Sequence, residues 1–278
     1  MTTAPVAASP SRYPRSTVPL RTALLGFLID VLIGGAVLLL VSIAAGLAWG
    51  VYRGFELAMQ ARAGGGAAAA DAIARQIGQP GTLAQMLIVL ASTSAAALVL
   101  YFGRRPASAD ERLRARLAWR QRSTWGWTLL VAAAVFVGSS AIAHAFEHFG
   151  IKPLPSNLGM VKEAMQRWPL FLVLFAVVLA PAYEELLFRR VLFGRFLAAG
   201  RPWLGLLLSS AAFALLHEIP GLSGNSPAAI CQLWLVYGGL GMAFGWLYWR
   251  TGSLWAPILA HALNNAIALA ALRWFDAG

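Results

Sequence analysis

Charged residues and cysteine are both scarce in this chain of 278 residues. Asp, Glu, Lys and Arg together make up 12% of it, whereas a soluble domain would carry about a quarter. Mean hydropathy is +0.67, and apolar runs of about 18 residues or more recur along the chain, which predicts a polytopic helical membrane protein. The short alternating strands of a membrane β-barrel are missing. The single cysteine, Cys231, excludes an internal disulfide.

Lysine is also rare, and Lys152 and Lys162 are the only two. The net charge of +11 therefore comes almost entirely from arginine. The positive-inside rule explains this excess better than nucleic acid as a partner. The segment 104–122, "RRPASADERLRARLAWRQR", holds seven arginines and only two acidic residues. It is therefore expected on the cytoplasmic side, with the N-terminus inside and the C-terminus outside. An integral protein of a bacterial cytoplasmic (inner) membrane is the expected setting.

The hydropathy pattern predicts an all-α fold with about seven transmembrane helices. The first apolar run begins near Leu24, exceeds about 20 residues and lacks a small-residue cleavage site, so it is expected to be an uncleaved span. The predicted spans are 24–49, 83–102, 125–145, 168–199, 203–217, 228–249 and 254–272.

The fourth predicted span is too long for a straight crossing and contains charges. As one helix, 168–199 would be about 48 Å long, whereas the hydrocarbon core is about 30 Å thick. It includes "PAYEELLFRR" at 181–190. A kink at Pro181, or a membrane portion beginning near 176, is therefore expected.

Three of these charges would together cost about 8–10 kcal/mol if nothing relieved them in lipid: Glu184, Glu185 and Arg189. Glu185 and Arg189 are four residues apart and can pair on one helix face. Glu184 points about 100° away and lacks that partner, which makes it the candidate general base. The alternative is that the whole cluster marks a cytoplasmic helix end among lipid headgroups.

Histidine occurs only four times, in two pairs. His217 lies near the end of the fifth predicted span, and His261 lies in the last one with Asn265 a turn further along the same face. Either histidine alone could be an ordinary packed core residue, but in lipid these polar groups are natural partners for the glutamates. The other pair, His144 and His148, forms H-x-x-E-H with Glu147, a zinc-site pattern. Its place at the outer end of the third span favours an amphipathic helix end.

Three of these segments resemble motifs of a known family. "EELLFR" from Glu184, "FALLH" ending at His217 and "HALNN" from His261 resemble E-E-x-x-x-R, F-x-x-x-H and H-x-x-x-N. These motifs belong to the CPBP family of intramembrane proteases, which includes CAAX prenyl endopeptidases and the bacteriocin-processing or self-immunity proteins of the Abi family. The resemblance covers about 165–272, and the first 160 residues carry no motif.

The resemblance implies a role for each matching residue. Glu184 and His217 would activate a water molecule, His261 and Asn265 would stabilise the oxyanion, and Arg189 paired with Glu185 would support them. No metal is required, but a divalent ion such as zinc could be held by Glu184, His217 and His261. The substrate would be a membrane-embedded or lipidated peptide or protein.

The same resemblance divides the chain into three parts. They are a polar cytoplasmic tail (1–22), N-terminal transmembrane helices and loops (23–164), and a catalytic transmembrane core (165–278).

Two other functions stay open at this point. One is a non-catalytic membrane scaffold or immunity protein of the same fold, and the other is a proton-coupled transporter, since intramembrane Glu and His often form proton relays. There is also a geometric difficulty. Measured from opposite membrane faces, Glu184 and His217 would lie at depths that differ by more than about 10 Å. They can converge only if the membrane portion begins later, at about 176–199, or if the helix kinks, and we expect that they do.

Overall fold

A computed structural model describes residues 18–63, 72–73 and 76–275, and every regular element in these ranges is a helix. Six helices are long and apolar enough to cross a membrane, so the predicted all-α polytopic architecture is confirmed. Five of them carry the labels α1 (Leu20–Ala63), α3 (Thr82–Arg104), α5 (Arg122–His148), α11 (Pro227–Thr251) and α12 (Trp255–Phe275). The sixth is the composite fourth span, Pro169–Ala198.

The seventh predicted span is a shorter helix, α10 (Pro202–His217). Its 16 residues make it about 24 Å long, which is less than the thickness of the hydrocarbon core. It ends at His217, inside the bundle, so it does not need the length of a full crossing. Two further helices, α4 (Ala109–Trp119) and α6 (Leu158–Arg167), lie in the predicted connections.

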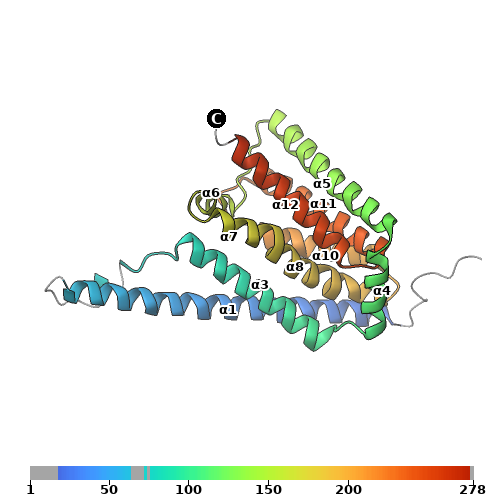
Figure 1. Ribbon diagram of the computed structural model, residues 1–278, viewed down its shortest axis with the longest axis horizontal. Helices are drawn as coiled ribbons and strands as arrows, with labels where there is room; N and C mark the ends of the chain where they lie inside the picture. Colours follow the sequence, from blue (N-terminus) through green and yellow to red (C-terminus); the bar gives the residue numbers. More distant parts are fainter. Residues whose placement is uncertain (1–17, 64–71, 74–75, 276–278) are drawn as a thin grey trace, which may run out of the picture.

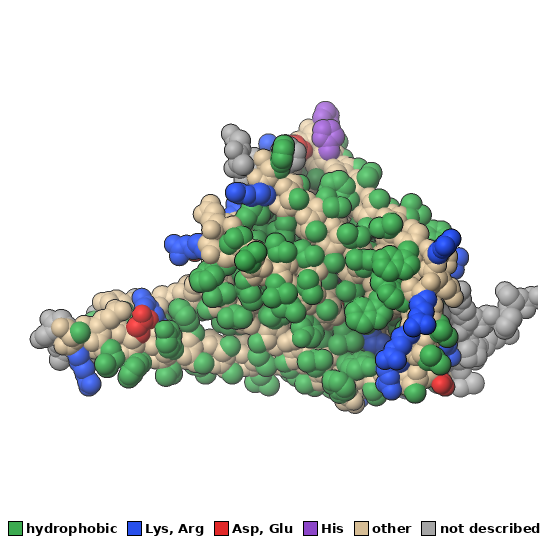
Figure 2. All heavy atoms as spheres, in the orientation of Figure 1, with side chains coloured by type: hydrophobic (Ala, Val, Ile, Leu, Met, Phe, Trp, Pro, Cys, Tyr) green, Lys and Arg blue, Asp and Glu red, His purple; other side chains and the backbone are tan. Residues whose placement is uncertain are grey.

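The first helix differs most from its predicted boundaries. α1 runs for 44 residues, from Leu20 to Ala63, and so extends both ends of the predicted 24–49. Its second half reaches well beyond the other helices (Figure 1). The polar tail and the glycine-rich stretch after Ala63 lie largely outside the described residues. Hydrophobic side chains cover most of the face in Figure 2, as expected of a surface in lipid.

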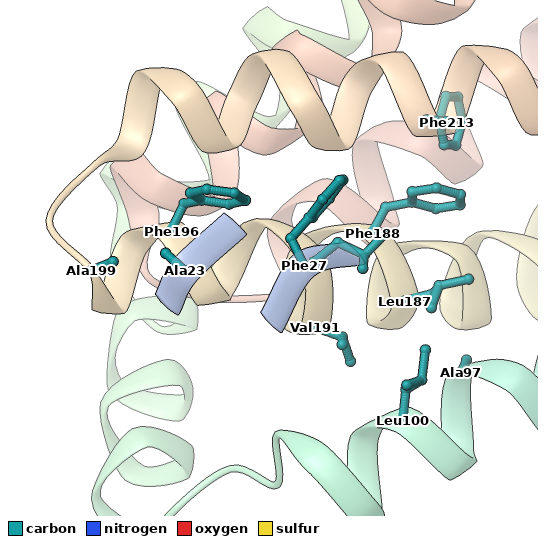
Figure 3. Close-up of a cluster of buried hydrophobic side chains, with 11 residues drawn as sticks. Ala23, Phe27, Ala97, Leu100, Leu187, Phe188, Val191, Phe196, Ala199 and Phe213 are labelled. Carbon is teal, nitrogen blue, oxygen red and sulfur yellow. The ribbon is translucent and has the colours of Figure 1, made fainter. Parts of the chain in front are cut away.

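The fourth span alternates between α- and π-helical turns. In order, it consists of α7 (Pro169–Val173), η1 (Leu174–Leu179), α8 (Ala180–Glu185), η2 (Leu186–Phe193) and α9 (Gly194–Ala198), where η marks the π-helical segments. The kink expected at Pro181 stays a prediction, and the irregularity that the structure shows is the π-helical stretch just before this proline. The largest apolar core forms around η2, with side chains from α1, α3, α9 and α10 (Figure 3).

The fourth span and α10 form an antiparallel hairpin. Their turn contains Gly200, whose φ of +68° suits a residue without a Cβ. Phe188 packs on Phe213 with ring centroids 5.0 Å apart, and a Cβ on Gly205 would lie 2.5 Å from that of Phe196. In each contact the two residues stand equally far in sequence from the turn, which sets the register of the hairpin.

A buried carboxylate joins α1 to this hairpin. Asp30 is fully buried, and its two oxygens accept hydrogen bonds from Arg104 Nε and Arg195 Nε, each at 2.8 Å. Gly26 leaves the space for Arg195, because a Cβ there would lie 2.2 Å from the guanidinium. The sequence analysis did not single out Asp30, although it is an acidic residue inside an apolar run.

A second ion pair joins α4 to η2. Glu111 accepts from Arg190 Nη1 at 3.0 Å and from Arg190 Nη2 at 2.8 Å. Burial alone would raise the pKa of Glu111, but hydrogen bonds from Arg190 and the Ser108 backbone, with the positive charge of Arg190, lower this pKa to about 2.

Replacing the buried carboxylate should destabilise the protein strongly. We expect Asp30→Asn to lower the free energy of unfolding by about 3–5 kcal/mol, because two arginines lose their shared partner in a buried place. The matched control is Glu56→Gln in the same helix, whose pair with Arg53 is partly exposed and should matter by about 1 kcal/mol or less. Thermal unfolding in detergent measures both, and equal shifts would contradict the assignment.

The lowered pKa of Glu111 predicts how stability depends on pH. A carboxyl whose pKa is lower in the folded state stabilises above its unfolded value, near 4.5, and loses this as pH falls towards about 2. The stability difference between wild type and Glu111→Gln should therefore be constant from about pH 7 to pH 5 and shrink below that. Asp110→Asn controls for loss of a negative charge from α4, and a difference that begins to shrink near neutral pH would refute the prediction.

Candidate active site

Glu185 and Arg189 form the predicted pair, and both are buried. Arg189 Nε lies 2.9 Å from Glu185 Oε2, with side chains 1% and 0% exposed. The guanidinium also lies over the ring of Phe213, 4.7 Å from its centroid. These two charges therefore do not stand among headgroups at a helix end. Arg190 points elsewhere, to Glu111.

His261 connects the two glutamates. Its Nδ1 lies 2.9 Å from Glu185 Oε1, and its Nε2 lies 3.9 Å from Glu184 Oε2. Phe244 stacks on the imidazole with centroids 5.0 Å apart. The ring is thus held between a carboxylate and an aromatic face. A carboxylate that accepts from Nδ1–H fixes the ring's orientation and leaves Nε2 towards Glu184.

His217 also directs its Nε2 atom towards Glu184. Its Nδ1 lies 2.8 Å from the carbonyl oxygen of Phe213, and since a carbonyl only accepts, Nδ1 carries the hydrogen. Nε2 of the neutral ring is therefore an acceptor, and it lies 3.7 Å from Glu184 Oε2. Glu184 and His217 are equally far from the hairpin turn, so they meet at one depth, and the predicted convergence of these two residues is confirmed.

These contacts bring three atoms to one space, and two of them, Glu184 Oε2 and His217 Nε2, are acceptors. Glu184 Oε2 is buried and has no hydrogen-bond partner among the described residues, and neither histidine Nε2 is within hydrogen-bond distance of it. Buried acceptors of this kind need a donor. One water molecule could donate to two of them, and its oxygen would then be held beside a carboxylate able to take its proton.

The side-chain amide of Asn265 is oriented by a missing backbone hydrogen bond in the fourth span. In η1 the amide of Ala180 bonds to the carbonyl five residues back, on Phe175. The next such bond would run from residue 181 to Ala176, but Pro181 has no N–H. The freed Ala176 carbonyl accepts instead from Asn265 Nδ2 at 2.9 Å. The proline therefore creates the acceptor that orients the asparagine, and the second N–H of that amide remains to be used.

A small pocket of about 10 Å³, room for about one water molecule, borders Glu184. It lies between α3 and the fourth span and is lined by Val89, Leu90, Thr93, Phe175, Ala180, Tyr183 and Glu184. Glu184 is the one charged residue of this lining. The surroundings of the carboxylate on this side are therefore largely hydrophobic.

Two residues beside His217 escaped the sequence analysis. The ring of Tyr237 lies 4.6 Å from the imidazole of His217. Glu218 is fully buried and accepts from Asn225 Nδ2 at 3.1 Å. Burial would raise the pKa of Glu218, but hydrogen bonds from Ser223, Asn225 and Ser156 lower it. Its position directly after a candidate histidine, at the end of an apolar helix, was the available signal.

The second histidine pair lies apart from this site. His144, Glu147 and His148 are all on the exposed last part of α5, and Glu147 pairs with Lys152 at 3.1 Å. In the described part of the chain, no three His, Cys, Asp or Glu side chains form a group that could hold a metal ion. The structure therefore places this motif at an exposed helix end, as expected.

The candidate site as a whole fits zinc only in part. One carboxylate and two imidazoles are ligands that zinc accepts, and both imidazoles have the second hydrogen bond typical of metal ligands. However, Glu184, His217 and His261 are not drawn together into a metal-binding group. The residues therefore suit the ion by the chemistry of their donor atoms.

Fold and site together define a polytopic helical membrane protein with a buried carboxylate–histidine centre. Residues 166–267 match the family described as type II CAAX prenyl endopeptidase Rce1-like. A protein of Bacillus subtilis (strain 168) named "Putative membrane peptidase YdiL" is 29% identical over 154 residues, which are 54% of this chain and 58% of that protein. The matched part thus spans little more than half of this relative. No solved structure matches the chain.

The family match at 166–267 covers all four predicted site residues. The resemblance of this part of the chain to the CPBP protease family is therefore confirmed.

Replacing the proline should uncouple stability from activity. In Pro181→Ala the new N–H can bond within the helix, so thermal stability should rise. The Ala176 carbonyl is then no longer reserved for Asn265, and we expect kcat on a cleaved membrane peptide to fall by about 10- to 100-fold. Pro169→Ala, at the first position of α7, is the control and should leave kcat unchanged. A Pro181→Ala variant as active as wild type would contradict the proposed role of this proline in orienting Asn265.

Proposed function

We propose that this protein is an intramembrane endopeptidase that hydrolyses a peptide bond in a membrane-associated protein or peptide. The observation that carries the proposal is the convergence on Glu184 Oε2 of two histidine nitrogens, at 3.7 Å and 3.9 Å. These groups come from three helices and lie in the region that matches a protease family. A scaffold would not need a buried carboxylate oxygen that lacks a hydrogen-bond partner and lies between two histidines, because such a group is costly when unpaired.

Glu184 and His217 activate the nucleophile in this proposal. A water between them donates one hydrogen to Glu184 and the other to His217 Nε2. As the water oxygen bonds to the carbonyl carbon of the substrate, Glu184 takes a proton. When the C–N bond of the tetrahedral intermediate breaks, that proton passes to the leaving amine, so the carboxylate is regenerated.

His261 and Asn265 stabilise the oxyanion. Asn265 holds one amide hydrogen on the Ala176 carbonyl and has a second to donate. His261 acts with a proton on Nε2, with Glu185 as the counter-charge at Nδ1. Fixed donors in a water-poor place stabilise developing charge strongly, and loss of one such donor costs about 10²- to 10³-fold in rate. Glu185 is in turn held by Arg189.

We propose that no metal is obligatory. If zinc took part, Glu184, His217 and His261 would hold it, and it would supply a bound water that loses its proton near neutral pH. The steps above do not require it, because Glu184 already provides a base for the water.

The substrate proposed is membrane-embedded or lipidated, which is supported by the apolar residues around Glu184 and by the match to a CAAX prenyl endopeptidase family. The protein is an integral membrane protein, and we place it in a bacterial cytoplasmic membrane. The arginine-rich segment after α3 favours a cytoplasmic position for that end of the bundle and for the start of α1.

The test uses purified protein in detergent with candidate membrane peptides. Glu184→Gln and His217→Ala are each expected to lower kcat by about 10²- to 10⁴-fold, since each removes a proton-transfer group. His148→Ala, at the exposed end of α5, should retain wild-type activity.

A chelator such as EDTA should leave wild-type activity unchanged. Loss of activity on chelation, restored by zinc, would overturn the metal-free mechanism. Cleavage by Glu184→Gln at the wild-type rate would overturn the catalytic assignment itself.

A further inference from the structure

The connection between α3 and α5 forms a helix of its own, α4. Ser108 caps it by accepting from the backbone of Glu111, while the Glu111 side chain accepts from the Ser108 backbone. Such a reciprocal cap stabilises a helix locally. Because α3 and α5 are consecutive membrane spans, α4 must lie at a membrane face. Figure 1 shows it running across the ends of these two helices rather than alongside them.

The side chains of α4 form rows along the helix, and successive residues within a row are four positions apart in the sequence. Glu111, Ala115 and Trp119 are half-buried and face the protein. Leu113 and Leu117 are 56% and 51% exposed. Residues four apart share one helix face, so the two leucines form an outward apolar strip. An apolar strip on a helix at a membrane face is typical of helices that lie in the interface.

Arginines flank this strip on both sides. Arg112 and Arg116 lie on one side of the leucines around the helix, and Arg114 lies on the other side. Two more arginines continue the cluster along the chain, Arg120 and Arg122. All five are exposed. Among the described residues, Arg114, Arg116, Arg120 and Arg122 make no ion pair or side-chain hydrogen bond with the protein. The blue surface beside α4 in Figure 2 shows this concentration of positive charge.

A tryptophan marks the depth of this helix. Trp125 at the start of α5 donates from Nε1 to the Trp119 carbonyl at 3.0 Å, and its side chain is 42% exposed. Tryptophans of this kind are enriched at the membrane–water boundary. The strip of leucines and the arginines beside it therefore stand at the level of the headgroups.

We propose that the outward face of α4 is a binding surface for anionic phospholipid headgroups of the bilayer. The leucines enter the boundary of the acyl chains, and the arginines bind headgroup phosphates, to which the guanidinium geometry is matched. Each such arginine near an anionic surface strengthens the binding. Because Arg190 binds Glu111 with both Nη atoms, a lipid held on α4 also secures the contact of α4 with the fourth span.

The test measures thermal unfolding of the full chain in detergent, with phosphatidylglycerol or phosphatidylcholine of the same acyl chains added. We expect phosphatidylglycerol to raise the melting temperature by about 2–4 °C or more and phosphatidylcholine to raise it much less. Arg114→Gln/Arg116→Gln should lose most of this difference. Arg62→Gln/Arg273→Gln, which removes two exposed arginines at the other end of the bundle, should keep it.

Three results would overturn the proposal. One is equal stabilisation by the two lipids, and another is an unchanged phosphatidylglycerol effect in Arg114→Gln/Arg116→Gln. The third is the same shift produced by soluble glycerol phosphate, which would point to free phosphate rather than lipid. Added salt should weaken the lipid effect in wild type, because the contacts are exposed. None of these readouts depends on peptidase activity, so the proposed function and the lipid surface can fail separately.

Discussion

The contact between Glu185 and Arg189 is the one on which the rest of the site depends. An unpaired charge deep in a membrane protein is expensive, and each of these residues removes that cost for the other. Once the pair exists, Glu185 has a second oxygen available for His261. His261 then faces Glu184, which has no arginine partner of this kind. The pair thus allows one carboxylate to stay without a protein partner in the middle of the bundle.

The backbone of the fourth span contributes as much to the site as its side chains. Its π-helical stretches lie immediately before and after α8, the short segment that carries both glutamates. π-helical turns inside α-helices are often found at functional sites, and here one of them leaves the Ala176 carbonyl to a side chain of α12. An irregular helix is less stable than a regular one, and at this site the irregularity positions Asn265.

The sequence predicted the helical membrane fold and the Glu185–Arg189 pair because both follow from local rules of hydropathy and helix spacing. It also predicted that Glu184 and His217 converge, but not how, because depths measured from two opposite faces disagree, whereas the hairpin turn near Gly200 sets a common origin. Asp30 and Glu218 were missed because their partners are far away in the chain, as Arg195 is from Asp30. The Asn265 contact could not be foreseen without knowing that the helix before Pro181 takes the π form.

The equal arms of the hairpin have a consequence for how this protein can change during evolution. An added or deleted residue between Glu184 and His217 would shift one arm by about 1.5 Å and rotate its side chains by about 100°. Most surface connections tolerate such length variation. Here, however, the number of residues between Glu184 and His217 determines which residues of the two arms face each other. Insertions and deletions should therefore be excluded from 185–216 among relatives that keep this site.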